Sequence, residues 1–314
     1  MNRFLPTLLL AAVVAACGTS TGDLGSVATP PPTEDPSIDL PSSEPTPGST
    51  AEPGESPSGS PQVTVEPHIP MTTVRAYFFL GSFTDNAGLA PVVRAIPSTK
   101  AVGAEAIKAL IAGPNDDELG ARPAMYTTIP EGTRFLGLTI DGGVATVNLS
   151  KEFQSGGGSA SVLGRLAQVV YTLTQFASVD SVQFQIDGQP VPVFGGEGVV
   201  LDEPVGRADY TDQLPAIFVD RPVWGGVLGN PARVVGMANV FEAAFRAEVL
   251  DPLGRVLADA PVTATCGTGC WGTFDVTIPY HVGKAGWGTL RVFEPSAKDG
   301  SPTSVTEYPV WLTP

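Results

Sequence analysis

Few side chains in this sequence could do covalent chemistry. Ser159 follows three consecutive glycines, Gly156–Gly158, but Ser161 stands where the nucleophile-elbow pattern G-x-S-x-G needs its last glycine. The only two histidines, His68 and His281, are both far from Ser159 in the chain, so no base is expected beside it. We therefore interpret Ser159 as the N-cap of the helix that follows and not as a nucleophile.

A run of carboxylates, Asp116, Asp117 and Glu118, could supply the two acids that glycoside hydrolysis requires. The same run follows Asn115 at the start of a short predicted helix that extends to about residue 120. Negative side chains there stabilise the positive end of a helix. We expect this capping role, and nothing in the sequence identifies a catalytic pair.

Cys266 and Cys270 are separated by three residues, of which Gly267 and Gly269 allow the backbone to curl until the two sulfur atoms meet. In an oxidising compartment we predict a disulfide between them. The alternative is a metal clip completed by His281, which would offer only three ligands. Gly267–Gly272 also fits G-x-G-x-x-G, but a strand is expected after it where a dinucleotide site needs a helix. We expect no cofactor and no metal.

Charge and composition exclude several classes of partner. The 314 residues include 17 Lys and Arg against 32 Asp and Glu, for a net charge of −15. No cluster of basic residues is present to displace counterions from phosphates, so we expect no nucleic-acid partner. With two His and three Cys, most zinc, haem and iron–sulfur sites would lack ligands.

The N-terminus reads as a targeting segment. Residues 1–16 carry one Arg and then an apolar run too short to span a bilayer. Small residues, Val14–Ala16, directly precede Cys17. This pattern resembles the lipobox of bacterial lipoproteins. The resemblance implies that Cys17 is acylated, with palmitate among the expected chains, and becomes the mature N-terminus. The predicted location is the extracytoplasmic face of the cell membrane, with the lipid as anchor. Ordinary signal cleavage beside a bystander cysteine is the alternative.

Residues 17–70 are predicted to be a disordered tether. Between residues 18 and 70 there are 12 prolines and eight carboxylates, without any aromatic residue, Lys or Arg. Such a segment cannot bury enough apolar surface to offset its ordering entropy, and its like charges extend it.

Residues 71–210 have the pattern of an α+β domain. The order is strand, helix, strand, strand, helix, strand, which predicts an antiparallel sheet with two main helices on one face. Asp141-Gly142-Gly143 is a strong hairpin signal. The expected elements are strands at 73–80, 92–96, 134–141, 144–149 and 182–187, and helices at 102–112 and about 160–177.

Residues 211–314 contain about seven short β-rich runs and no helical period, which predicts an immunoglobulin-like β-sandwich. We expect Trp271, Trp287 and Trp311 to supply much of its apolar bulk. Each of the two regions falls in the usual size range of a domain, so each is expected to fold by itself.

Both regions also resemble a known family. The motifs Gly113-Pro114, Ile129–Thr133, Ala145–Ser150 and Gln168–Thr174, in this order, are similar to the GerMN domain of bacterial sporulation and germination proteins. One departure is Asn148, where the family commonly has Asp. The amide removes a negative charge, and we expect the fold to be unaffected. The second region resembles the immunoglobulin-like module that often follows GerMN, and the features that match are Pro222, Pro231, Gly236, Phe241–Ala243, Asp251, Gly254, Trp271, Phe274 and Phe293-Glu294.

The resemblance implies a non-enzymatic envelope lipoprotein with no catalytic residues to assign. Its two modules would contact another envelope protein or the cell wall, and oligomerisation is compatible with this role. The alternative is an envelope hydrolase that acts on peptidoglycan or another glycan through carboxylates that the sequence does not identify. A solute-binding transporter subunit is disfavoured because it would need two matched α/β lobes.

Overall fold

The computed structural model describes residues 70–82, 85–196 and 198–314 of the chain. The expected signal segment, Cys17, His68 and the tether up to residue 69 lie outside these ranges. Within the described residues, no helix is both long and apolar enough to cross a bilayer. These residues belong to one compact unit.

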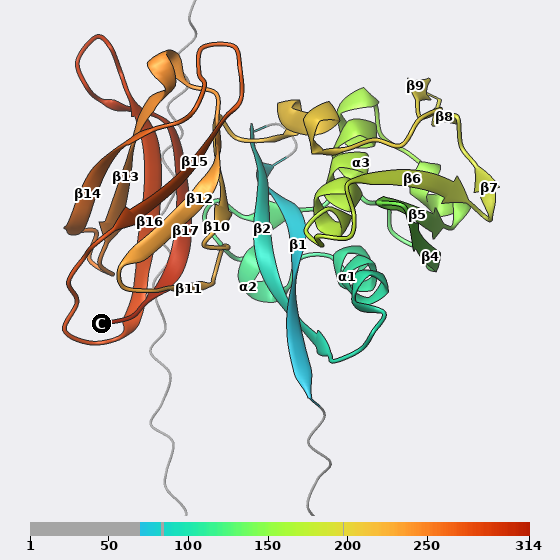
Figure 1. The fold of residues 1–314 in the computed structure, drawn as a ribbon, viewed down its shortest axis with the longest axis horizontal. Helices are drawn as coiled ribbons and strands as arrows, with labels where there is room; N and C mark the ends of the chain where they lie inside the picture. The colour runs from blue at the N-terminus through green and yellow to red at the C-terminus, as the bar shows by residue number, and fades with distance from the viewer. Residues whose placement is uncertain (1–69, 83–84, 197) are drawn as a thin grey trace, which may run out of the picture. The chain divides into compact units, whose positions relative to one another are not determined.

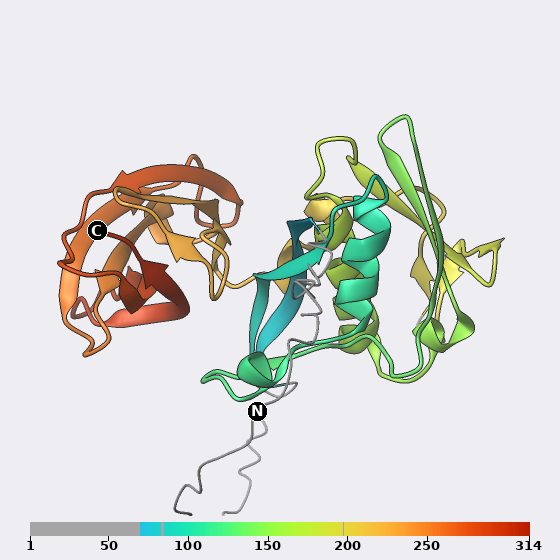
Figure 2. The ribbon, with the colours of Figure 1, turned by 90° about the horizontal axis from the view of Figure 1, so that it is seen from below.

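The first region has three layers, with two helices packed between two sheets (Figures 1 and 2). The first sheet is antiparallel, and the segment Ala76–Leu80 of its central strand is completely buried, which accounts for its unbroken apolar sequence. The strands of this sheet, in spatial order, are β2 (Asp85–Pro97), β1 (Met71–Ser82) and β3 (Met125–Tyr126).

The two main helices lie at the predicted places. α1 (Val102–Ile111) ends before Gly113, and α3 (Ser159–Leu173) turns Leu166, Val170 and other apolar side chains into the core. Both helices contact β1 on one side and the second sheet on the other. The short α2 (Asp116–Leu119) follows α1, and the remaining short elements are the 3-10 helices η1 (Lys151–Gln154) and η2 (Arg207–Gln213) and the strands β8 (Val193–Phe194) and β9 (Val199–Val200).

The sheets differ from the predicted fold in two ways. The expected single sheet with both helices on one face is divided into two sheets with the helices between them. We expected an antiparallel sheet, but β5 and β6 pair in parallel, from Val144↔Ser181 to Leu149↔Ile186. The chain leaves β5, crosses over through α3 and enters β6 from the same end, which is what a helical crossover between parallel strands requires. The α+β class is confirmed. The strands of this sheet, in spatial order, are β4 (Phe135–Asp141), β5 (Val144–Leu149), β6 (Ser181–Ile186) and β7 (Gln189–Pro190).

The second region is the predicted all-β, immunoglobulin-like sandwich. Its inward side chains alternate with outward ones, as in β12, where Ala232, Val234, Gly236 and Ala238 are buried. One sheet holds β10 (Ile217–Arg221), β12 (Ala232–Ala238) and β15 (Gly272–Ile278). The other holds, in spatial order, β11 (Val227–Leu228), β17 (Pro302–Leu312), β16 (Gly286–Pro295), β13 (Ala244–Leu250) and β14 (Val256–Thr263); a short 3-10 turn, η3 (Phe241–Ala243), precedes β13.

The tryptophans do not fill this sandwich, contrary to expectation. Trp287 is 52% exposed and Trp311 is 38% exposed, and Trp271 is only partly buried. Trp287 and Trp311 are paired in register on β16 and β17, and their outward positions follow from the alternation, because Leu290 and Val310 occupy inward positions of the same strands. Leucine, valine, alanine and phenylalanine side chains form the core instead.

A partly buried polar cluster connects β10 to β1 and η2. The Asp220 carboxylate accepts hydrogen bonds from Arg75 Nη1 (2.5 Å) and Tyr77 Oη (2.7 Å), and it forms a longer ion pair with Arg207 Nη1 (3.5 Å). The Arg207 guanidinium also lies over the Tyr171 ring, 4.7 Å from its centroid. Burial favours the neutral acid, but the two guanidinium groups and the Tyr77 hydroxyl outweigh it and hold the pKa of Asp220 below its ordinary value.

Candidate binding cleft

The serine loop lies directly before α3, and its expected N-cap is displaced by one residue. α3 begins at Ser159, and Gly158 occupies the N-cap position that we had expected Ser159 to fill. The loop before it is held by Arg165, which is only 1% exposed. The Arg165 guanidinium donates hydrogen bonds to the carbonyl oxygens of Phe153 and Ser155 (2.8 Å each) and Gly156 (2.7 Å). This arrangement fixes the backbone of the loop.

The carboxylate run at Asp116–Glu118 caps α2, as predicted. Asn115 Oδ1 accepts a hydrogen bond from the Glu118 N–H (2.9 Å), and Glu118 Oε2 accepts one from the Asn115 N–H (2.9 Å), which completes a capping box. Glu118 is buried and forms a two-pronged ion pair with Arg94 (2.6 and 2.5 Å). Both oxygens of its carboxylate therefore accept hydrogen bonds that stabilise the fold.

The motif at Gly267–Gly272 leads into strand β15 and not into a helix, so the context for a dinucleotide is missing. Gly272 lies directly against the backbone of Cys266, where an added Cβ would be 2.2 Å from the Cys266 nitrogen. The glycine is thus explained by close backbone packing.

The structure places Cys266 and Cys270 together with their sulfur atoms in bonding contact and their Cα atoms 5.8 Å apart. His281 is exposed. Across the described ranges, no group of three or more His, Cys, Asp or Glu side chains is arranged to hold a metal ion. Cys17 lies outside the described residues.

We predict that Cys266 and Cys270 form a disulfide in the protein isolated from the cell envelope. The structure places the two sulfur atoms at bonding distance, and thiols at that distance pair in an oxidising compartment. The small loop limits the stabilisation to about 2 kcal/mol. Mass spectrometry with and without reductant should show a gain of two hydrogens on reduction. Two free thiols in protein alkylated before lysis would contradict the prediction.

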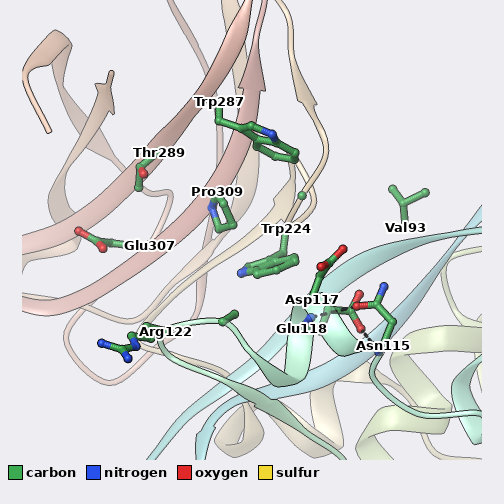
Figure 3. A pocket seen from close by; sticks show the side chains of 12 residues that line it. Val93, Asn115, Asp117, Glu118, Arg122, Trp224, Trp287, Thr289, Glu307 and Pro309 are labelled. Atoms are coloured by element: carbon green, nitrogen blue, oxygen red, sulfur yellow. Dashed lines mark hydrogen bonds between the residues drawn. The ribbon is translucent and has the colours of Figure 1, made fainter. Parts of the chain in front are cut away.

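A cleft of about 660 Å³ opens in the described part of the chain (Figure 3). Its walls come from segments far apart in sequence: the α2 region, the segment that follows β10, and the outer faces of β16 and β17. In the view of Figure 3, Pro309 lies between Trp287 and Trp224. The lining residues are Val93, Asn115, Asp117, Glu118, Ala121, Arg122, Trp224, Gly225, Trp287, Thr289, Glu307 and Pro309.

Backbone hydrogen bonds hold Trp224 in place from both sides. Its own N–H donates to the Pro91 carbonyl of β2 (2.9 Å), and the Gly225 N–H donates to the Pro309 carbonyl of β17 (2.8 Å). The Trp311 N–H donates a hydrogen bond to the Gly226 carbonyl (2.8 Å). Trp224 is partly buried against the core and presents its remaining surface to the cleft.

The cleft continues beyond Trp287 along the face of the second sandwich sheet. A second cavity of about 450 Å³ shares Trp287, Thr289 and Glu307 with the first. It is lined further by Leu250 and Pro252 at the end of β13. The two cavities thus meet at one exposed aromatic ring.

Three charged groups in the cleft have no ion-pair partner among the described residues: Asp117, Glu307 and Arg122, which are all exposed. The fourth charged group of the cleft, Glu118, is neutralised by its ion pair with Arg94. In the adjoining cavity, Arg291 pairs with Glu248 and Asp251 pairs with Arg255. The cleft therefore offers two free carboxylates and one free guanidinium beside its aromatic rings.

Sequence reasoning missed this cleft. It used the tryptophans as core residues, although Trp287, Thr289 and Arg291 alternate with Gly288, Leu290 and Val292 along one strand. That alternation could have placed Trp287 on the outer face. No signal in the sequence connects it to Asp117 or Trp224.

Asn148, the departure from the family motif, is accounted for by a hydrogen bond. Its Oδ1 accepts the Gly188 N–H (2.9 Å), in the tight turn between β6 and β7. The amide oxygen performs there the acceptor role that a carboxylate oxygen could also perform.

Comparison with known proteins identifies both regions. Residues 75–192 match the family model Germane, described as sporulation and spore germination. Residues 216–301 match the family model Gmad2, described as an immunoglobulin-like domain of bacterial spore germination. A search of curated proteins found no match.

Three solved structures that match parts of this chain come from Clostridium perfringens and Bacillus subtilis. A Clostridium perfringens protein described as a candidate lipoprotein is 23% identical, with 46% of this chain and 93% of that chain covered and a TM-score of 0.32. The first GerMN domain of the Bacillus subtilis sporulation protein GerM is 17% identical (44% and 99% covered, TM-score 0.36). The tandem GerMN domains of the same protein are 14% identical (66% and 61% covered, TM-score 0.37). The described part of this chain thus consists of a Germane-family domain followed by an immunoglobulin-like domain of the Gmad2 family.

Proposed function

We propose that this protein is a non-enzymatic lipoprotein, anchored through Cys17 on the extracytoplasmic face of the cell membrane. Its two domains would contact another envelope protein or the cell wall in a process related to sporulation or germination. The observation that carries the proposal is the pairing of two such domains behind a lipobox-like sequence.

The contacts of the candidate catalytic groups support a non-enzymatic role. The Glu118 carboxylate is occupied by the capping box and by the ion pair with Arg94. The loop before Ser159 accepts hydrogen bonds from Arg165. A binding protein needs rigid exposed surface instead, and the cleft provides it through Trp224 and Trp287.

Replacing Cys17 with alanine is expected to release the protein from the membrane fraction, because the acyl chains are its proposed anchor. Membrane fractionation and labelling with a palmitate analogue would measure the change. Cys270→Ala serves as the matched control, since it removes a cysteine without touching the lipidation site. A Cys17→Ala protein that remains fully membrane-bound with its signal cleaved would contradict the proposal.

The proposed contacts are tested by crosslinking in native membranes followed by identification of what is attached. Recovery of a defined envelope protein or of wall material supports the contact role. A chain that crosslinks to nothing in intact cells would overturn it.

A second candidate function is glycan hydrolysis, favoured by one observation: the free carboxylates of Asp117 and Glu307 line the same cleft. Release of soluble sugar from purified cell wall by the protein, abolished in Asp117→Asn or Glu307→Gln, would establish it. Equal and negligible release by all three proteins supports the non-enzymatic role.

A further inference from the structure

We propose that the cleft between Trp224 and Trp287 binds a strand of the bacterial cell-wall glycan, through sugar rings that carry N-acetyl groups. This inference rests on the proposed function and names the wall as the partner of the cleft. It depends on aromatic surface, unpaired charge and the extension of the groove along one sheet.

The aromatic surface suits the apolar faces of sugar rings. A pyranose presents C–H groups on its flat face, and an indole ring offers a large, flat apolar surface with little rotamer entropy to lose. Trp287 is paired edge-to-face with Trp311, at 5.5 Å between ring centroids and an interplanar angle of 88°. Trp224 is fixed by the backbone bonds to β2 and β17. Trp311 therefore supports the Trp287 ring, and the main chain of Trp224 is held by its backbone bonds while its side chain packs against the core.

The free charges favour a ligand rich in hydroxyl and amide groups. The carboxylates of Asp117 and Glu307 accept hydrogen bonds, and the exposed Arg122 guanidinium donates them. An acetamido group presents an N–H to a carboxylate and a methyl group to an aromatic ring. A polyanion such as nucleic acid would face two carboxylates against one guanidinium, which disfavours it. The acidic segment 18–70 of the chain itself is disfavoured for the same reason.

The shape of the groove favours a chain over a single small molecule. The two cavities, of about 660 and 450 Å³, meet at Trp287, so one ligand can continue from the first into the second. The groove runs over the face of a sheet in which β16 is hydrogen-bonded to β13 on one side and to β17 on the other. An extended peptide cannot add to β16 as a further strand, because its backbone groups are already paired. Recognition must come from side chains that contact a flat ligand.

The test uses the purified full-length protein and the hexamer of β-1,4-linked N-acetylglucosamine as the probe. Tryptophan emission should change on titration, and the protein should co-sediment with purified peptidoglycan. Trp287→Ala and Trp224→Ala should each weaken binding of the hexamer by about tenfold, the effect of losing one stacking contact. The cellulose hexamer, which has hydroxyl groups in place of the acetamido groups, should bind more weakly.

Phe241→Ala is the matched control, because Phe241 is an equally exposed aromatic residue (56%) that does not line the cleft. It should bind the hexamer like the wild type. Since Trp224 also packs against the core, the unfolding midpoint of each variant is measured, and the exposed Trp287 decides the case if Trp224→Ala does not fold.

Several results would overturn the inference. They are an absence of hexamer and peptidoglycan binding, binding that Trp287→Ala leaves unchanged, or binding of a proline-rich synthetic peptide in place of either glycan. One of these results can occur together with loss of the Cys17→Ala protein from the membrane fraction and with crosslinking to an envelope protein. The assignment of the cleft to glycan then fails, and the proposed function stands. If crosslinking also recovers nothing, the proposed function fails with it.

Discussion

Replacing Asp220 with asparagine is expected to lower the free energy of unfolding by about 3 kcal/mol. The Asp220 side chain is 18% exposed and faces two guanidinium groups, Arg75 and Arg207. Removing one partner of a largely buried ion pair leaves the remaining charge without compensation, which costs more than the pair itself contributes. Tyr77 would also lose its charged acceptor. Urea unfolding of the wild type and the variant measures the difference.

The effect of this substitution should depend on pH in one direction. Because Arg75 and Arg207 hold the pKa of Asp220 below its ordinary value against the opposing effect of burial, the folded state binds this proton less readily than the unfolded state. The stabilisation is therefore fully present above the unfolded pKa and is lost as the pH falls through the folded pKa. The difference in the free energy of unfolding between wild type and Asp220→Asn should therefore become smaller in acid. It should stay constant between pH 6 and 8.

Asp275→Asn is the matched control for Asp220→Asn. Asp275 also forms a two-pronged ion pair, with Arg233, but both side chains are at least half exposed. Exposed pairs contribute about 0–1 kcal/mol, so the loss should stay below about 1 kcal/mol. Equal losses for the two variants would show that the Asp220 cluster does not stabilise the fold as a buried pair.

Replacing Arg165 with methionine is expected to destabilise the protein by about 3 kcal/mol. Methionine keeps the apolar stem, so the change isolates the guanidinium. Without it, the carbonyl oxygens of Phe153, Ser155 and Gly156 lose their donors. Phe153 is buried, and a buried acceptor without a partner costs about 1–3 kcal/mol, while the bonds to the exposed Ser155 and Gly156 add less. The Ser161 hydroxyl loses a contact with Nη2 as well (3.0 Å).

Arg134→Met is the control for Arg165→Met, since Arg134 is exposed and its nearest carboxylate, on Glu152, lies 3.9 Å away. Its removal should change stability by less than about 0.5 kcal/mol. Hydrogen exchange should show that Arg165→Met loosens the 153–161 loop before the rest of the domain. A variant as stable as Arg134→Met, with an unchanged loop, would refute the proposed role of the guanidinium.

The local elements of this fold follow from sequence patterns alone. The apolar spacing in 102–112 and about 160–177 predicts two helices, which the structure has at 102–111 and 159–173. Asp141-Gly142-Gly143 predicts the hairpin between β4 and β5. These features depend on neighbours within a few residues, so a linear pattern carries them. The ordered GerMN motifs then identified the family, which the Germane match confirms. The predicted helix end at about 177 was too late, because the chain leaves the helix at Thr174.

Only the tertiary structure decided how distant segments meet. The parallel pairing of β5 and β6 depends on the route of the chain through α3, and the Arg75–Asp220 pair joins residues 145 positions apart. The cleft brings Trp224 and Trp287 to the same surface as residues of the α2 region. A strand pattern shows which side chains share a face but not which face another segment covers, because that depends on the packing of whole layers. Trp287 is a large apolar residue of the kind that usually fills a core. It is exposed because the other face of its strand packs inward.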